Sequence, residues 1–236
     1  MKTTVCLVVG PQATSAFVPD YPGCWVLGQT RESALNKVKP AIEVWFNWVQ
    51  KHGENPENAS EGIDIEVAEM LSVDYNPAEA RVPEPLFWSE VLPINEKDIE
   101  RTIRLMDYSR QDLLDLVRNR PEESFEWKPP GKPRTIHNCL EHIAHVDAWY
   151  ITRLNIDLPD DFPAAVFDLL GHTRSIVIDV LKNFPPRKMS GVFQPRKYKS
   201  PVCNLWTARK VLRRLVDHER LHTKYIQTVL EMYYNR

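Results

Sequence analysis

The sequence predicts an α+β protein of two domains, a small β-β-β-α-β domain followed by an all-α four-helix bundle. Short runs rich in β-branched residues surround one helical stretch in roughly the first 75 residues, a pattern typical of a small domain with one sheet. Beyond residue 92 only helical periodicity remains. A proline-rich segment lies between these parts, and 236 residues are enough for two domains.

Four strands and one helix are predicted in the N-terminal part. Residues 3–9, TTVCLVV, predict the first strand, and the segments TSAFVPD and CWVLGQT predict two short strands between turn residues. Thr30 is then a suitable N-cap for a helix that ends before Gly53. Pro40 inside this helix predicts a kink. Residues 63–71, IDIEVAEML, alternate apolar and acidic side chains as a half-exposed strand does.

The segment at residues 76–98 carries four prolines and shows no clean periodicity. This composition predicts the connector between two domains. We place the boundary near residue 92, which gives a first domain over residues 1–92, linker included, and a helical domain over residues 93–236. The sequence leaves open whether the connector packs or swings.

Helical periodicity covers most of the second domain. Asn95 is a suitable cap for its first helix, which has one apolar stripe and ends at Pro121. Further helices are predicted at residues 135–154, 163–182 and 205–233. Proline-rich stretches separate the first helix from the second and the third from the fourth. Four long helices with such connections predict a four-helix bundle.

The composition gives no overall argument for nucleic-acid or membrane binding, since the formal net charge is −2 and the pI is about 6.4. From His172 onward, however, 14 Lys and Arg stand against 4 Asp and Glu, and the earlier residues have 16 against 28. The four cysteines lack the C-x-x-C spacing of zinc or redox motifs. No apolar run suggests a signal peptide or a membrane span. We therefore expect a cytoplasmic protein with reduced thiols.

Two histidines stand four residues apart in the segment VDHERLHTKYI, residues 216–226, with a glutamate between them. This order matches the zinc-protease motif H-E-x-x-H. On a helix, His218 and His222 lie one turn apart and about 40° around the axis, so both imidazoles can reach one ion. The alternative is that they only pack against neighbouring side chains or water.

A protease interpretation lacks a third ligand. Zinc proteases have it downstream of the motif, and the 14 residues after His222 contain no histidine and only Glu231 as a carboxylate. Two histidines lie upstream instead, His142 and His145, on the second predicted helix. If helices two and four are neighbours in the bundle, three imidazoles meet and leave one coordination position open, as in catalytic metal sites.

The segments LEHIAHVDAWYITRL and WTARKVLRRLVDHERLHTKYI together resemble the DinB-like family of four-helix bundles, over roughly residues 93–236. The resemblance implies that His142 of helix two and His218 and His222 of helix four bind a metal ion. It does not assign a catalytic residue. The family does not use the position of His145, which implies that this residue packs or contacts a ligand.

Other motif positions agree in part. The resemblance places Asp147 in an acidic position of the family and Trp149-Tyr150 in its aromatic pair. Glu219, about 100° from His218, is expected to be solvated or to contact a ligand residue rather than to face the metal. The family's usual Gly-Gln step after the last ligand and its histidine before that ligand are replaced here by Lys224-Tyr225 and Leu221. These changes keep the ligands and alter the pocket lining, and hence the substrate.

The segment FVPDYPGCWVLGQTRESALNKVKPAIEVWFNWVQKHG resembles the HicB-like antitoxin domain, which has a small β-β-β-α-β fold, here over about residues 1–75. The matching residues are Pro19, Asp20, Pro22, Gly23, Cys24, Gly28, Thr30 and Ala34, while Gln29 and Ser33 replace the usual acids. The resemblance implies a protein partner. We expect no nuclease activity, because the first strand has no paired carboxylates, and no DNA-binding motif is evident. Gly23 and Gly28 also fit ordinary turns.

These residues predict a metal-binding protein. Three neutral imidazoles suit Zn²⁺, Ni²⁺ or Fe²⁺. The DinB-like resemblance implies a transferase that uses a low-molecular-weight thiol, or a metal-dependent hydrolase, acting on a small molecule. The basic C-terminal segment would suit an anionic ligand, although charge runs are usually solvated.

The competing hypothesis is a non-enzymatic binding or regulatory protein. In that case the HicB-like domain recognises a partner protein, or the chain forms a homo-oligomer, and the bundle is a scaffold. Nucleic acid is a disfavoured partner, because the aromatic residues of the basic segment form no recognition motif. We expect no membrane partner.

Overall fold

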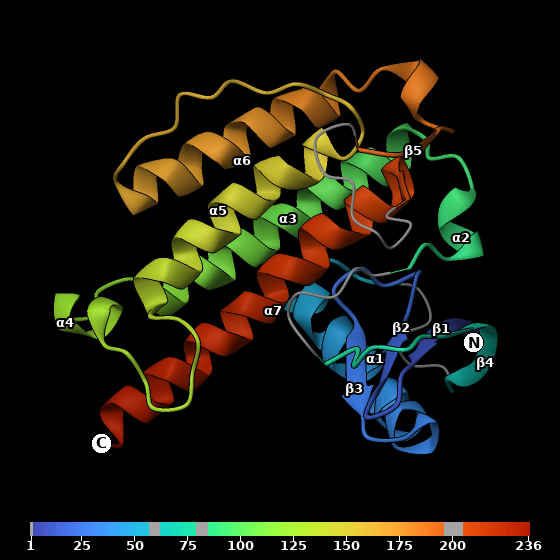
Figure 1. Cartoon of the computed structure of the whole chain (residues 1–236), viewed down its shortest axis with the longest axis horizontal. Helices are drawn as coiled ribbons and strands as arrows, with labels where there is room; N and C mark the ends of the chain where they lie inside the picture. Colours follow the sequence, from blue (N-terminus) through green and yellow to red (C-terminus); the bar gives the residue numbers. More distant parts are fainter. Residues whose placement is uncertain (1, 57–61, 79–84, 196–204) are drawn as a thin grey trace.

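The computed structural model describes residues 2–56, 62–78, 85–195 and 205–236. A small mixed β-sheet with one helix comes first in the chain, and a helical region follows it (Figure 1). The α+β prediction is confirmed at this level. Within the described ranges, no helix is both long and apolar enough to cross a membrane.

The N-terminal sheet contains four strands in the spatial order β3-β2-β1-β4. These are β1 (Lys2–Val9), β2 (Thr14–Phe17), β3 (Trp25–Gly28) and β4 (Asp64–Ser72). β2 pairs antiparallel with both β1 and β3, whereas β4 pairs parallel with β1. A parallel pair needs a crossover connection, which contains α1 (Arg31–Lys51). The strands and helix follow the predicted β-β-β-α-β order.

α1 begins at the predicted cap. The Thr30 hydroxyl accepts a hydrogen bond from the backbone N–H of Ser33, and the Ser33 hydroxyl accepts one from the backbone N–H of Thr30. This capping box satisfies two donors at the start of the helix. The helix continues through Pro40. Its buried face, which includes Ile42, belongs to the same apolar cluster as Leu7 of β1.

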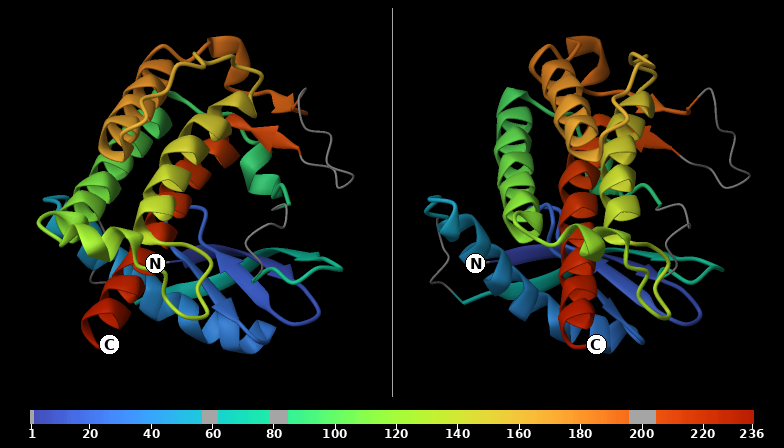
Figure 2. Two further views of the ribbon diagram at one scale, coloured as in Figure 1. Left: turned by 60° about the vertical axis from the view of Figure 1, so that its left-hand side comes forward. Right: turned by 90° about the vertical axis from the view of Figure 1, so that its left-hand side faces the viewer.

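Four long helices form most of the helical region: α3 (Glu96–Val117), α5 (Ile136–Thr152), α6 (Val166–Lys182) and α7 (Ala208–Tyr234). Each begins and ends within four residues of its predicted bounds. α5 packs against α6 and α7, and α3 packs against the same two helices, so each long helix contacts two of the others (Figures 1 and 2). The shorter elements are α2 (Trp88–Val91), α4 (Glu122–Glu126), a 3₁₀ helix (Pro186–Lys188), β5 (Val192–Phe193) and β6 (Trp206–Thr207).

The sheet and the helices share an apolar core. One cluster of buried side chains contains Val5 of β1 and Ile42 of α1 together with Leu105 of α3 and Leu215 of α7. A second cluster, which includes Leu140, joins α3, α5, α6 and α7. Burial of apolar surface between the two predicted domains therefore fixes them against each other.

The described part of the predicted connector packs on the protein. Phe87 is 1% exposed, and its ring centroid lies 5.6 Å from that of Phe17. Glu90, also buried, accepts a hydrogen bond from the Phe87 backbone and pairs with Arg213 of α7 at 2.7 Å. Residues 79–84 of the connector lie outside the described residues. The connector is anchored by a few separate side chains, which produce no periodic pattern in the sequence. The sequence therefore did not predict whether the connector packs on the protein.

A turn of the N-terminal part docks on α7 next to the histidine motif. The backbone N–H of Gly23 donates to the Asp217 carboxylate at 2.5 Å, and Arg220 Nε donates to the Gly23 carbonyl at 3.3 Å. The Arg220 guanidinium also lies 3.6 Å from the ring centroid of Trp48. Gly23 has a φ of 86°, and a Cβ there would lie 2.3 Å from Arg220 Cδ. Glycine therefore permits both the turn and its close approach to α7.

Gly23→Ala is expected to destabilise the protein more than Gly53→Ala does. Both glycines have a positive φ, so each substitution carries a backbone strain of roughly 1 kcal/mol or more. A Cβ at Gly53 meets no atom within 4 Å, whereas one at Gly23 collides with Arg220. Urea unfolding of the two variants beside the wild type measures the difference. Equal losses in the free energy of unfolding would contradict the close docking of this turn.

Candidate metal centre

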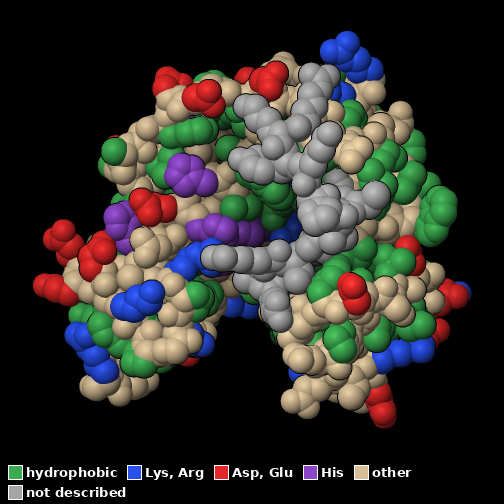
Figure 3. All heavy atoms as spheres, viewed as in Figure 1, with side chains coloured by type: hydrophobic (Ala, Val, Ile, Leu, Met, Phe, Trp, Pro, Cys, Tyr) green, Lys and Arg blue, Asp and Glu red, His purple; other side chains and the backbone are tan. Residues whose placement is uncertain are grey.

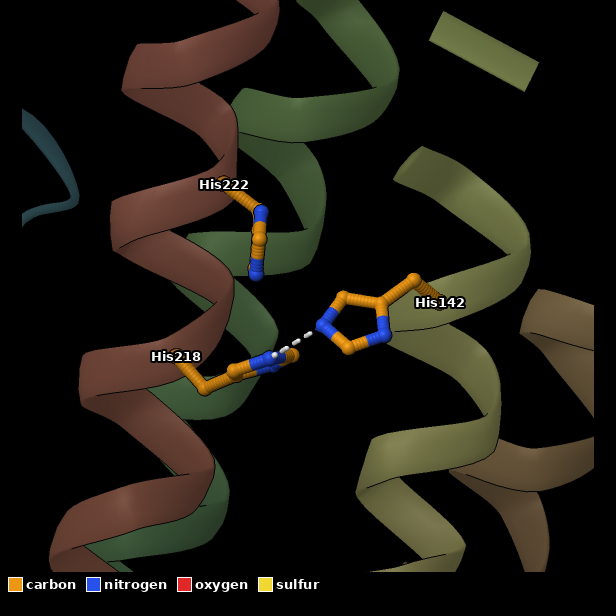
Figure 4. A group of neighbouring side chains, drawn as sticks. All are labelled: His142, His218 and His222. Atoms are coloured by element: carbon orange, nitrogen blue, oxygen red, sulfur yellow. Dashed lines mark hydrogen bonds between the residues drawn. The ribbon is translucent and has the colours of Figure 1, made fainter. Parts of the chain in front are cut away.

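Two neighbouring helices carry the three predicted ligands. His142 lies on α5, and His218 and His222 lie one turn apart on α7, with all three rings directed into the space between the helices (Figure 4). α5 and α7 pack together although His142 and His218 are 76 residues apart in sequence. Apolar neighbours such as Ile143 and Leu215 anchor these helix faces in the core. The structure thus brings all three histidines together.

The imidazole rings converge closely. His218 Nε2 lies 3.2 Å from His142 Nε2, and one ring nitrogen from each of the three residues lies within 4.8 Å of the others. Two imidazole nitrogens bound to one tetrahedral ion at about 2.0–2.1 Å stand about 3.4 Å apart. The spacing of His142 and His218 is therefore close to that of two ligands of one ion, and His222 is within reach of the same point.

All three imidazoles are neutral at neutral pH. The pKa of His142 is lowered to about 4, mainly by burial and in smaller part by the positive charge of Arg134. Burial likewise lowers the pKa of His222 to about 3 and that of His218 well below its ordinary value. Neutral imidazole is the form that binds a metal ion. Burial therefore keeps the lone pairs of the cluster available.

Cys139 holds the orientation of the third ring. Its Sγ lies 3.3 Å from His222 Nδ1, and burial raises the pKa of the Cys139 thiol to about 12. A hydrogen bond at Nδ1 fixes the ring plane and directs Nε2 toward the cluster. Nδ1 of His218 is buried and has no hydrogen-bond partner among the described residues. The donor set, three neutral imidazoles with one oriented by a neighbour, fits a divalent transition metal ion.

Both rings of the aromatic pair of α5 pack on Trp206, and Tyr150 also faces the histidines. The Tyr150 ring lies 5.7 Å from that of His218, and its hydroxyl accepts hydrogen bonds from Nε and Nη2 of Arg214 at 3.1 and 2.8 Å. The ring centroid of Trp206 lies 5.5 Å from that of Trp149 and 5.7 Å from that of Tyr150. Tyr150 therefore forms part of the wall around the histidines, whereas the ring contacts of Trp149 within the described ranges are with Tyr150 and Trp206.

The remaining histidines lie outside the cluster. His145 is exposed, and its ring contacts that of Phe162 at 5.9 Å, so it packs as the resemblance implies. His137 pairs with Glu126 at 2.7 Å, and His52 stacks on Tyr108. His172 is half-buried beside Phe162, at 6.1 Å.

Glu219 belongs to a buried ion-pair network. Its carboxylate, fully buried, pairs with Arg110 at 2.5 Å and with Arg174. Asp147, also fully buried, pairs with Arg174 at 2.9 Å and with Arg110 at 3.3 Å. The expectation that Glu219 is solvated, or in contact with a ligand residue, is wrong. Two arginines from neighbouring helices take up both of its oxygens.

The network keeps Glu219 ionised. Burial alone raises the pKa of Glu219, but the charges of Arg174 and Arg110 outweigh it and hold this pKa below its ordinary value. For Asp147 burial prevails and raises the pKa, even though Arg174 opposes it. A carboxylate held by two guanidinium groups is not placed to accept a proton from a water at the histidines. This arrangement gives Glu219 a structural position unlike that of the glutamate in H-E-x-x-H proteases.

Basic residues at the start of α7 are used inside the protein. Arg213 pairs with Glu90 at 2.7 Å and with Asp217 at 2.6 Å. Arg209 pairs with Asp98 at 3.1 Å. These acidic partners reduce the positive charge that the C-terminal segment would otherwise present to a ligand. A count of basic residues along the sequence does not reveal these ion pairs.

Sequence reasoning missed the residues that support the site. Cys139 lies three residues before His142, which places both on one face of α5, so helical spacing could have identified it. Arg110 falls on the apolar stripe of α3 between Met106 and Leu113, and a charge on such a stripe indicates a buried partner. Which residue is that partner depends on how the four helices pack, so it cannot be predicted from a single sequence.

Two neighbouring helices bring three neutral imidazoles together. The fold and the site therefore define the class of protein, which is a helical protein with the donor set of a transition-metal site. The family model of the DinB superfamily matches residues 105–226, a little over half of the chain and the part that contains the three histidines. The chain therefore belongs to the DinB superfamily, which is often metal-binding. Comparisons with curated proteins and with solved structures gave no match. The HicB-like resemblance lies outside the matched residues and stays a prediction.

Glu219→Gln is expected to lower the free energy of unfolding by roughly 3–5 kcal/mol, because it leaves two buried guanidinium groups with one carboxylate. Glu231→Gln, on the exposed side of α7, is the matched control and should change it by about 0.5 kcal/mol or less. Urea unfolding measures both. A fully stable Glu219→Gln protein would contradict the assigned role of the network.

The metal-free protein is expected to lose stability as the pH falls below about 6.5. In the unfolded chain His142 and His222 bind a proton near pH 6.5, whereas in the folded protein their pKa values are about 4 and about 3. Between these values the unfolded chain binds more protons, so acid favours unfolding. Chemical unfolding at pH 7, 6, 5 and 4 measures this. His142→Phe should flatten the slope, and an unchanged slope would show that the buried histidines do not cause the acid sensitivity.

Proposed function

We propose that this chain binds one divalent transition metal ion through His142, His218 and His222. The observation that carries the proposal is the 3.2 Å approach of two imidazole nitrogens from separate helices, with a nitrogen of the third ring close by. Buried imidazoles this close together repel each other when protonated, and a shared cation gives their lone pairs a common partner. Zn²⁺, Ni²⁺ and Fe²⁺ all suit this donor set.

The proposed fold of residues 93–236 is a DinB-like four-helix bundle. The cyclic packing of α3, α7, α5 and α6 supports it, as does the family match across all four helices. In such bundles, metal sites are built from side chains on facing helices. His142 on α5 and the two histidines of α7 follow this arrangement.

The proposed activity is a metal-dependent transferase that uses a low-molecular-weight thiol, or a metal-dependent hydrolase. With three protein ligands, a bound metal ion keeps a position for an external molecule, and it can hold a thiol as its thiolate or polarise a carbonyl group. The chain itself supplies neutral ligands, an oriented His222 and a wall formed by Tyr150. Because Glu219 is engaged with arginines, a protease mechanism based on the H-E-x-x-H glutamate is not proposed.

An alternative is a binding protein in which the N-terminal part is a HicB-like domain that recognises a partner protein. The observed β-β-β-α-β order supports this, and β4 stands at the edge of the described sheet. Edge strands often receive a strand from a partner. The two proposals differ in metal content, since a scaffold has no need of a stoichiometric transition metal.

His142→Ala and His222→Ala are each expected to abolish stoichiometric metal binding, while the wild type holds about one ion per chain. His145→Ala, on the same helix as His142 and outside the cluster, is the matched control and should keep the ion. The measurement is elemental analysis of protein without a histidine tag, purified and then reloaded with Zn²⁺, with circular dichroism to verify folding. Equal metal content in all four proteins would refute the proposed site.

A further inference from the structure

A cavity of about 380 Å³ lies between α1, α3 and α7. Val44 and Trp48 of α1 and Leu116 of α3 give it an apolar wall. Arg220 and Lys224 of α7 bring two positive charges to the same lining. The volume is large enough for a small organic molecule.

The cavity lies on the reverse side of α7 from the histidine cluster. Each residue of a helix is turned by about 100° from the one before it, so Arg220 is about 160° around the axis from both His218 and His222. Histidine side chains are visible in the hollow of the face shown in Figure 3. The described lining of the cavity, by contrast, includes none of the three predicted ligands. The cavity is therefore separate from the candidate metal centre, and an inference about it does not depend on the proposed function.

Direct contacts fix the guanidinium group of Arg220 at this place. It lies 3.6 Å from the ring centroid of Trp48, and its Nε donates to the Gly23 carbonyl at 3.3 Å. Within the described ranges the group forms no ion pair, and its two Nη nitrogens donate no hydrogen bond. Neither Nη nitrogen is a fully buried atom without a partner, so both remain open to solvent. The planar group therefore has donors available for a paired hydrogen bond to an oxyanion.

Lys224 stands one turn after Arg220 on the same face of α7. Its side chain is exposed, and its ammonium group has no acidic partner in the part of the chain that the structure describes. Like charges four residues apart on a helix repel each other. An anion held between the two groups would turn this repulsion into two attractions.

The acidic side chains of the lining are already paired. The Asp112 carboxylate accepts hydrogen bonds from Trp48 Nε1 at 2.8 Å and from Lys51 Nζ at 3.2 Å. Asp115 pairs with Arg118 at 3.7 Å. The two basic residues of α7 are therefore the charges of the described lining that lack a counter-ion.

We propose that this cavity binds a small organic anion whose carboxylate or phosphate group pairs with Arg220 and Lys224. The apolar part of the ligand packs against the wall formed by Val44, Trp48 and Leu116. Because α1 belongs to the sheet region and α7 to the helical region, the ligand bridges the two regions and stabilises their contact.

The test compares three probes that share a phenyl ring: benzoate, phenyl phosphate and the neutral benzyl alcohol. Each is titrated into the whole chain in its metal-free form, so that no metal ion recruits the anion. Two-dimensional NMR follows the indole N–H of Trp48, whose signal is assigned with Trp48→Phe. We expect at least one anion to shift this signal to saturation and to bind about tenfold or more tightly than benzyl alcohol. The tighter of the two anions identifies the acid group.

Three variants test the two basic residues with the tighter anion. Arg220→Gln is expected to lower the affinity about tenfold or more, and Lys224→Gln about threefold, because each removes one charge. Lys39→Gln, on the exposed side of α1 and outside the lining, is the matched control and should bind as the wild type does. Circular dichroism verifies folding. Arg220 also contacts the turn at Gly23, so Lys224→Gln decides the result if Arg220→Gln does not fold.

Two results would overturn the proposed anion site. One is a wild type that binds neither anion more tightly than benzyl alcohol. The other is a preference for the anion that keeps its full strength in Lys224→Gln, since the binding would then lie elsewhere on the protein.

Discussion

The geometry of the candidate site depends on four buried charges, each from a different long helix. Arg110 comes from α3, Asp147 from α5, Arg174 from α6 and Glu219 from α7, and each arginine contacts both carboxylates. Glu219 follows His218 directly, and Asp147 lies five residues after His142. Locking these two carboxylates to the same two arginines therefore sets how far α5 can slide along α7, and with it the distance between the ligands.

Apolar side chains of similar volume would hold four helices together at least as strongly, since desolvation of the ions offsets much of their attraction. Apolar contacts, however, permit neighbouring registers along a helix. The network does not, because Arg110 also donates to the Leu170 carbonyl of α6 and Arg174 to the Met106 carbonyl of α3. A shift of one turn would leave several buried donors without acceptors. Such a network suits a site whose ligands must meet within a few tenths of an ångström.

Local patterns were enough to predict the strands, the long helices and the pairing of His218 with His222, because each depends on residues a few positions apart. The contribution of His142 came from a resemblance, since one sequence does not say which helices are neighbours. The anchoring of Phe87 and the pairing of Glu219 were not predictable in this way. Both depend on contacts between residues more than 60 positions apart.

Four successive residues of α7 show why the contacts of its side chains were hard to predict. Each residue is turned by about 100° from the one before it, so the four side chains point to four different parts of the protein. Asp217 binds the turn at Gly23, His218 faces α5, Glu219 binds Arg110 and Arg174, and Arg220 covers Trp48. The sheet region covers the side of α7 that carries Asp217 and Arg220, and the next residue, Leu221, is exposed to solvent. The sheet region therefore holds the reverse side of the helix that carries two ligands, and it contributes to the site without touching the histidines.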